Sequence, residues 1–291
     1  MRVLILGGGG TLGAFSAGAL RALDRVGWQA DALIGSSAGS INLLRSFVGG
    51  ADAACDFWTS LSARELLQAT ALHNVLRDGL LSPKQLYQRV DAGVDFARVL
   101  ADPRPIGFIV VDLQTGKVAV RGNRSEKTAE DLRHVAHGSF SLPPLLPAVR
   151  LGKQLLADGG FLRNAPLETA LDLGATEIVY LCNVQVAPHD DFRPSWAPRT
   201  LLRYANIYFR RASNIGYVDA PIVESHYHGV PFLTIAPPSS LRLFQAALPT
   251  GNAMKKLVAM GEERARRAIE AARHVAPEIG ESGGVRASIF G

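Results

Sequence analysis

Cysteine is scarce in this chain of 291 residues, which contains only Cys55 and Cys182, far apart in the sequence. Two such thiols cannot make a disulfide framework, and neither belongs to a Cys-x-x-Cys or histidine-rich cluster that would hold zinc. We therefore predict no metal site and a reducing compartment. The predicted location is the cytoplasm, with peripheral association to membranes.

The chain also lacks a hydrophobic run long enough for a membrane span or a signal peptide. Residues 3–20 carry no charge, but six of them are glycine, and large apolar residues follow one another without a break only at 3–6. A signal-peptide core needs roughly 7–15 apolar residues, and glycine disfavours a helix by about 1 kcal/mol relative to alanine. We predict instead a buried strand, a glycine loop and a helix over residues 14–26.

No linker or low-complexity stretch divides the sequence, and glycine and proline show no period. We therefore predict one domain over residues 1–279, followed by a loose tail over residues 280–291. Charged residues make up 20% of the chain, and the formal net charge is +5. A balance of that size suits nucleic acid, an anionic membrane surface or neither, so charge alone identifies no partner.

Short apolar strands alternate with helices along most of the chain. Strands are expected at residues 3–6, 32–34, 107–112, 117–121, 178–184 and 232–236. Helices are expected at residues 14–26, from the end of the second strand to 47, and at 53–61, 83–96, 128–136, 166–174 and 254–274. This alternation is typical of an α/β fold in which helices cover both faces of a mainly parallel sheet.

The second predicted strand runs into the sequence GSSAG at residues 35–39. This fits the G-x-S-x-G pattern of a nucleophile elbow, a sharp strand-to-helix turn that raises a serine hydroxyl above the sheet. Small neighbours are needed because the turn forces strained backbone angles, and the amides that open the helix favour developing negative charge. Ser37 is therefore a candidate nucleophile, with an ordinary turn of small residues as the alternative.

The first predicted strand is followed by a second glycine pattern, GGGTLG at residues 8–13. It fits the fingerprint of dinucleotide-binding proteins, which also need an acidic residue at the end of the second strand for a ribose hydroxyl. Here that strand ends at Ile34 and enters the serine turn. The glycine amides can instead form an oxyanion hole, and both loops are expected at the carboxyl edge of the sheet, where open α/β sheets place their sites.

The general base is less evident, because none of the seven histidines belongs to a recognisable triad pattern. Asp158 lies in the sequence ADGG at residues 157–160, which is most often a turn. A partly desolvated carboxylate beside a serine can also take the hydroxyl proton directly. Asp158 is therefore a candidate base.

Four segments occur in a fixed order: residues 8–13, residues 35–39, SLPPLLP at 141–147 and DGGFLRNAP at 158–166. Together they resemble the patatin-like phospholipase family, lipid acyl hydrolases with a Ser–Asp dyad, over about residues 3–184. The resemblance implies a patatin-type α/β/α fold with Ser37 as nucleophile and Asp158 as general base. It implies oxyanion donors and shaping glycines as follows: the amides of Gly9, Gly10 and Thr11 as donors, and Gly8, Gly13, Gly35, Gly39, Gly159 and Gly160 as glycines of the elbow and loops.

The same resemblance implies hydrolysis of lipid esters, of the phospholipase A, lysophospholipase or carboxylesterase type, through a serine acyl-enzyme without metal or organic cofactor. An acyltransferase that uses the same dyad is the first alternative, and a nucleotide-binding Rossmann protein is the less favoured one. The expected partners are lipid or phospholipid and an anionic membrane surface, without nucleic acid. One departure is Leu12, where the family usually carries arginine or lysine.

Two further segments bear on how a lipid would bind. Residues 192–216 contain five arginines, no acidic residue and several aromatic rings, which is typical of a helix at an anionic lipid surface. A helix packed on the domain with a solvated basic face is the alternative interpretation. Residues 73–81 and 139–146 are apolar loops that we expect to wall an acyl channel.

Overall fold

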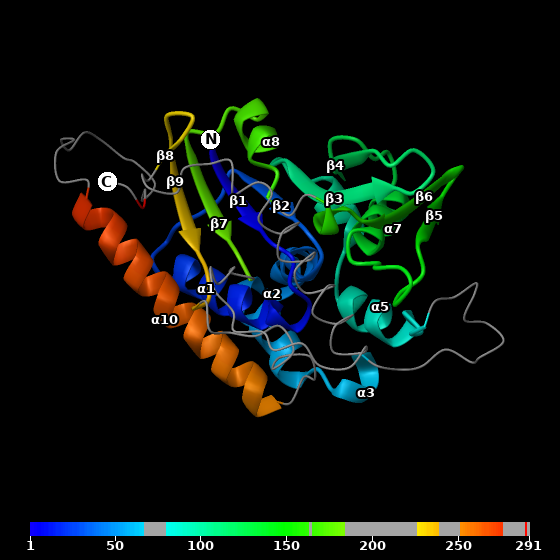
Figure 1. Ribbon diagram of the computed structural model, residues 1–291, viewed down its shortest axis with the longest axis horizontal. Helices are drawn as coiled ribbons and strands as arrows, with labels where there is room; N and C mark the ends of the chain where they lie inside the picture. Colours follow the sequence, from blue (N-terminus) through cyan, green and yellow to red (C-terminus); the bar gives the residue numbers. More distant parts are fainter. Residues whose placement is uncertain (67–79, 163–164, 184–225, 239–250, 276–288, 290–291) are drawn as a thin grey trace, which may run out of the picture.

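The computed structural model describes residues 1–66, 80–162, 165–183, 226–238, 251–275 and 289. Within these ranges a sheet of nine strands lies at the centre, and Figure 1 shows helices packed along it. The helices α1 (Gly13–Arg25), α2 (Ala38–Ser60) and α10 (Gly251–Val275) share one core with one face of the sheet. The short helix α8 (Leu167–Asp172) packs into a second core on the opposite face. The predicted α/β/α fold with a mainly parallel sheet is confirmed.

The strand order is β5-β6-β3-β2-β1-β7-β9-β8, with β4 paired to β3. Five strands run parallel to one another: β1 (Arg2–Leu6), β2 (Ala32–Gly35), β3 (Ile106–Asp112), β7 (Glu177–Leu181) and β9 (Val230–Ile235). Four strands pair antiparallel: β4 (Val118–Gly122), β5 (Val149–Leu151), β6 (Gln154–Asp158) and β8 (His226–Tyr227).

Strand β1 shows why the sequence forms a covered sheet. All five of its residues are buried, and successive side chains of a strand point to opposite faces. Leu4 and Leu6 pack in the core shared with α1 and α2, whereas Val3 and Ile5 pack in the core shared with α8. An uninterrupted apolar run is therefore required, because both faces of this strand are covered.

The short helix η1 (Gly10–Leu12) directly follows β1. The remaining helices lie around the side of the sheet that carries β3 and β6. They are α3 (Ala63–Leu66), α5 (Lys84–Asp91), α6 (Phe96–Leu100), α7 (Ala129–Gly138) and η3 (Gly159–Phe161). The helix expected over residues 83–96 is divided, because Gly93 adopts a φ of +78° between α5 and α6. The hairpin of β5 and β6 was not expected from the sequence.

Several expectations concern segments at the margins of the fold. Residues 192–216 lie outside the described residues, and of the tail expected at 280–291 the structure describes Ile289, whose side chain is buried. No helix in the described ranges is both long enough and apolar enough to cross a membrane. The described residues also contain no group of three or more His, Cys, Asp or Glu side chains arranged to hold a metal ion.

Candidate active site

Ser37 occupies a strained turn between β2, which ends at Gly35, and α2, which begins at Ala38. Its backbone has φ 51° and ψ −122°, values that a non-glycine residue rarely adopts and that cluster at functional sites. Ser36 and Ala38 are buried, but Ser37 between them is partly exposed. The turn therefore presents one hydroxyl outward, as predicted for a nucleophile elbow.

The glycines that flank the elbow are required by close packing. A Cβ atom at Gly39 would lie 2.0 Å from the carbonyl oxygen of Leu6 in β1, and one at Gly35 would lie 2.7 Å from the Cα atom of Ser40. Neither neighbour is a flexible side chain. The pattern of small residues thus lets α2 start directly against the end of β1.

Asp158 reaches the elbow because two strands meet along one edge of β3. Strand β2 pairs with β3 up to Gly35 opposite Phe108, and β6 pairs with β3 from Asp158 opposite Val110. Strand β4 occupies the other edge of β3, so β2 and β6 follow one another on the same edge. Because β6 is antiparallel to β3, its carboxyl end faces the carboxyl end of β2.

The Ser37 hydroxyl lies next to the Asp158 carboxylate and acts on it as a hydrogen-bond donor that lowers its pKa. The amide of Gly160 donates a hydrogen bond to Asp158 Oδ1 at 2.9 Å. Asp158 is only 4% exposed, and this burial raises its pKa to about 7, although the hydrogen bonds from Ser37 and Gly160 act in the opposite direction. The carboxylate is thus poised to exchange a proton near neutral pH.

The two glycines after Asp158 allow this approach. A Cβ atom at Gly160 would lie 1.7 Å from Ser36 Oγ, and one at Gly159 would lie 2.6 Å from the carbonyl carbon of Val110. The sequence ADGG is therefore more than a turn, because both glycines let the carboxylate segment pack against the elbow and β3.

Residues 139–141 hold both members of the Ser37–Asp158 pair through the backbone. The amide of Ser37 donates to the carbonyl of Ser139 at 2.9 Å, and the amide of Asp158 donates to the carbonyl of Ser141 at 2.8 Å. One short segment after α7 therefore fixes the separation of the two residues. Nothing in the sequence pattern of this segment indicated that role.

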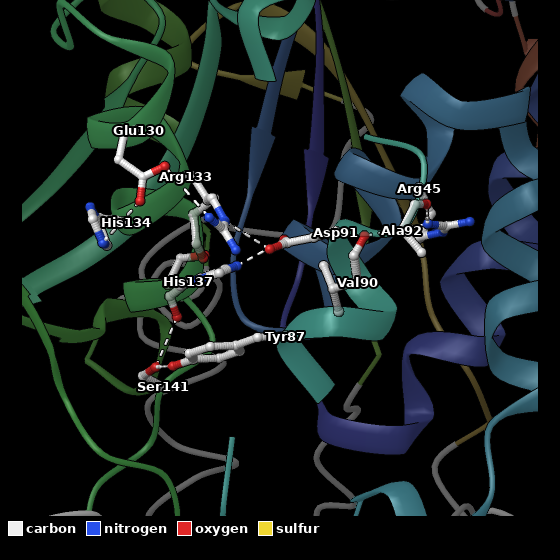
Figure 2. A network of polar contacts seen from close by, with 12 residues as sticks. Arg45, Tyr87, Val90, Asp91, Ala92, Glu130, Arg133, His134, His137 and Ser141 are labelled. Carbon is white, nitrogen blue, oxygen red and sulfur yellow. Dashed lines mark hydrogen bonds and ion pairs between the residues drawn. The ribbon is translucent and has the colours of Figure 1, made fainter. Parts of the chain in front are cut away.

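A network of polar contacts holds Ser141 in place (Figure 2). The Ser141 hydroxyl donates to the carbonyl of His137 and accepts from Tyr87, whose pKa is raised to about 12 by burial, so that it keeps its proton. The Tyr87 and His137 rings stack with centroids 4.0 Å apart. His137 Nε2 lies 2.8 Å from Asp91 Oδ1, and Arg133 binds the other oxygen of Asp91 at 2.8 Å. His137 is thus a packed residue at the end of α7.

The glycine loop after β1 lies beside Ser37. Gly9 and Gly10 have φ values of 154° and 57°, and the turn η1 begins at Gly10, so the loop amides belong to the start of a helix. Gly10 and Thr11 line the same cavity as Ser37, whereas Gly9 is buried. Strand β2 ends at Gly35 without an acidic side chain, so the ribose-binding feature of a dinucleotide site is missing.

The cavity at Ser37 has a volume of about 220 Å³, and none of the described residues in its wall is charged. Residues 139–146 contribute as predicted, and Leu81 contributes from the other expected loop, of which residues 73–79 lie outside the described ranges. The apolar residues that line the cavity are Ala38, Ile41, Trp58, Leu61, Leu81, Leu86, Phe140, Leu142, Leu145 and Leu146. The contributions of α2 and α5 were missed, because an apolar helix face indicates burial without indicating a cavity.

Sequence and structure comparisons show which known proteins this chain is similar to. The family model described as patatin-like phospholipase matches residues 4–171, more than half of the chain. An uncharacterized NTE family protein of Mycobacterium tuberculosis is 29% identical over 182 residues, which are 56% of this chain and 27% of that protein. A patatin-like phospholipase domain-containing protein of Caenorhabditis elegans is 29% identical over 197 residues, or 62% of this chain and 13% of that protein.

The chain thus spans about a quarter or less of the length of these relatives. Among solved structures, VipD from Legionella pneumophila superposes with a TM-score of 0.55 at 13% identity, covering 93% of this chain and 67% of that one. This likeness concerns the fold. The family match covers the elbow, the glycine loop and the Asp158 segment, and the chain belongs to the patatin-like phospholipase family.

Proposed function

We propose that this protein is a serine-dependent lipid acyl hydrolase that cleaves carboxylic esters of phospholipids or lysophospholipids. The observation that carries the proposal is the strained elbow that presents Ser37 at an apolar cavity beside the buried carboxylate of Asp158. A hydroxyl with an adjacent base is an activated nucleophile, and an apolar wall accepts an acyl chain.

The reaction begins when Asp158 takes the hydroxyl proton as Ser37 Oγ attacks the ester carbonyl carbon. The carbonyl oxygen gains the negative charge. The amides of Gly9, Gly10 and Thr11 stabilise this charge as hydrogen-bond donors. Collapse of this intermediate breaks the ester bond, and Asp158 returns the proton to the departing alcohol. Water, deprotonated by Asp158, then attacks the acyl-enzyme and releases the fatty acid with Ser37 restored.

Labelling with a fluorophosphonate tests the nucleophile. We expect wild type to be labelled and to hydrolyse a medium-chain ester, and Ser37→Ala to lose both properties. Asp158→Asn should lower kcat by several orders of magnitude, as in other nucleophile–base units. The matched control is Ser36→Ala, because Ser36 carries a buried hydroxyl with no partner among the described residues. Labelling of Ser37→Ala at the wild-type level would reject the proposal.

Product analysis with an added alcohol separates hydrolysis from acyl transfer. Both reactions share the acyl-enzyme, and they differ in whether water or the alcohol resolves it. We expect free fatty acid to remain the main product when the alcohol is present. A predominance of the new ester would instead identify an acyltransferase.

Docking on anionic lipid is a separate part of the proposal and rests on sequence alone. Residues 192–216 carry five arginines and no acid, and each basic residue near such a surface contributes up to about 1 kcal/mol. We expect the double variant Arg203→Glu, Arg210→Glu to co-sediment less with anionic vesicles than wild type, and equally with neutral ones. Equal binding of both proteins to anionic vesicles would assign the segment a structural role.

A further inference from the structure

A buried polar network contacts both ends of the glycine loop. Its three polar members, Ser16, Asn42 and Asn183, are each 0% exposed. They come from α1, from α2 and from the residues after β7. Burying so many polar groups is costly unless each is hydrogen-bonded, so their partners show what the network holds.

Asn183 holds the start of the loop. Its side-chain amide donates to the carbonyl of Gly7 at 2.7 Å, and its Oδ1 accepts from the amide of Ser16 at 3.2 Å. Gly7 is the first residue after β1, so the place where the chain leaves the sheet is tied to α1 and to the end of β7.

Asn42 holds the other end of the loop. Its Nδ2 donates to the carbonyl of Gly13 at 2.9 Å and to the Ser16 hydroxyl at 2.8 Å. Its Oδ1 accepts from Trp58 Nε1 at 2.6 Å, and the Trp58 ring lines the cavity. Asn42 therefore connects the loop to the cavity wall.

Between Gly7 and Gly13 the loop contributes one aliphatic side chain, that of Leu12, to the core. Leu12 is 1% exposed and packs in the core shared with α1 and α2. Amide side chains thus bind a carbonyl at each end of the loop, at Gly7 and Gly13, and the Ser16 hydroxyl also donates to the Gly13 carbonyl at 3.1 Å.

We propose that Asn42 and Asn183 are positioning residues for the oxyanion hole: by holding the carbonyls of Gly13 and Gly7, they fix the amides of Gly10 and Thr11 opposite Ser37. This inference rests on the proposed function. Donors that are fixed before the reaction stabilise the developing charge without reorganisation, and a misplacement of about 1 Å can cost about a hundredfold in rate. Neither asparagine touches substrate in this proposal.

The chain offers a matched control in Asn123, a third buried asparagine that binds backbone. Its Nδ2 donates to the carbonyls of Asp102 and Arg104, and its Oδ1 accepts from the amide of Ile106. These contacts lie at the amino end of β3, the opposite edge of the sheet from Ser37. Asn123→Leu therefore removes a comparable set of buried hydrogen bonds without touching the loop.

The experiment measures kcat and KM for a medium-chain ester with Asn42→Leu, Asn183→Leu and Asn123→Leu, well below each melting temperature. We expect the first two to lower kcat about 10- to 100-fold with KM changed less than about threefold. Asn123→Leu should lose stability but keep kcat. Ser16→Ala, which removes one acceptor of Asn42 and is a milder change, should lower kcat about three- to tenfold and serves where a leucine variant does not fold.

A second measurement separates positioning from general loss of structure. A trifluoromethyl ketone forms a tetrahedral adduct that carries an oxyanion, so its affinity should fall by the same factor as kcat/KM. The affinity for a medium-chain alcohol, which fills the apolar cavity but forms no oxyanion, should stay within about threefold of wild type.

The outcomes are distinct for the two proposals. If wild type is active and the loop variants match Asn123→Leu in kcat and in ketone affinity, the positioning role is overturned and the hydrolase function stands. If wild type hydrolyses no ester and is not labelled at Ser37, the proposed function fails and this inference fails with it.

Discussion

The chemistry of the site depends on two residues in unfavourable states. Ser37 adopts backbone angles that cost energy, and the Asp158 carboxyl, which must be ionised to act as the proposed base, is only 4% exposed. Such local costs persist only when the surrounding structure determines them. Here the backbone bonds from Ser37 to Ser139 and from Asp158 to Ser141 supply that constraint.

The first prediction is a pH profile. Only ionised Asp158 can take the Ser37 proton, and its pKa is raised to about 7 by burial. We expect kcat/KM for a soluble ester to rise as pH increases through about 7 and to level above it, since this parameter reports groups of the free enzyme. Initial rates between pH 5 and 9 test this, and a flat profile across that range would show that Asp158 is not the base.

The second prediction concerns stability at the same residue. The folded-state pKa of Asp158 is raised from 3.8 to about 7, so its contribution to stability is fully present below the unfolded pKa and is lost as pH rises through about 7. Asp158→Asn keeps the shape without the charge. At pH 8 we expect the free energy of unfolding of this variant to exceed that of wild type by a few kcal/mol, seen as a higher melting temperature. Near pH 4 the two proteins should differ little. A variant less stable than wild type at pH 8 contradicts this.

At the scale of elements, the parallel strands and the elbow could be predicted because local chemistry determines them. Small residues between an apolar strand and a helix allow few structures other than the turn at Ser37. The hairpin of β5 and β6 was not predictable in the same way, because β5 has three residues of mixed exposure. Its place depends on pairing with β3, which is distant in sequence, and so Asp158 was expected in a turn and lies at the end of a strand.

Helix ends and buried contacts show the same limit. Gly93 lies between α5 and α6 and has a φ of +78°. The sequence around it favours a helix and therefore does not indicate this break. The asparagines Asn42 and Asn183 carry no motif, because their function as anchors follows from the carbonyls that tertiary packing brings to them. Sequence reasoning identified Ser37, Asp158 and the glycine loop but not the side chains that hold them.

The third prediction is a preference for longer acyl chains, which belongs to the elements that wall the cavity. Each buried methylene contributes about 0.8 kcal/mol, and the walls from α2, α5 and residues 139–146 carry no charge. We expect kcat/KM to be higher for octanoyl than for acetyl esters. Leu86→Trp, which fills the cavity from α5, should lower the octanoyl value more than the acetyl value. Equal values for both esters in wild type would exclude a substantial acyl pocket.

At the scale of the whole molecule, helices from the first and the last parts of the described chain pack against each other. Helices α1 and α10 lie side by side against the sheet (Figure 1). A Cβ atom at Gly18 would lie 1.9 Å from the carbonyl oxygen of Val258, and one at Gly261 would lie 1.9 Å from that of Phe15. The backbones are therefore in contact at both glycines. Because α1 directly follows the glycine loop, α10 supports the helix on which that loop is built.

The fourth prediction follows from this contact. In an isolated helix, replacing glycine with alanine stabilises by about 1 kcal/mol, but here the added methyl group must push two backbones apart. We expect Gly261→Ala to destabilise the protein by about 1–3 kcal/mol or more, measured as a lower melting temperature. The control is Gly251→Ala on the same helix, whose Cβ would lie at an ordinary 3.4 Å from the Thr59 carbonyl oxygen and should change stability little. A melting temperature for Gly261→Ala at or above that of wild type would mean that α10 does not pack against α1 at this distance. If it falls as expected, kcat should fall as well at temperatures where the variant is folded, because the displaced α1 directly follows the loop that carries the proposed oxyanion donors Gly10 and Thr11.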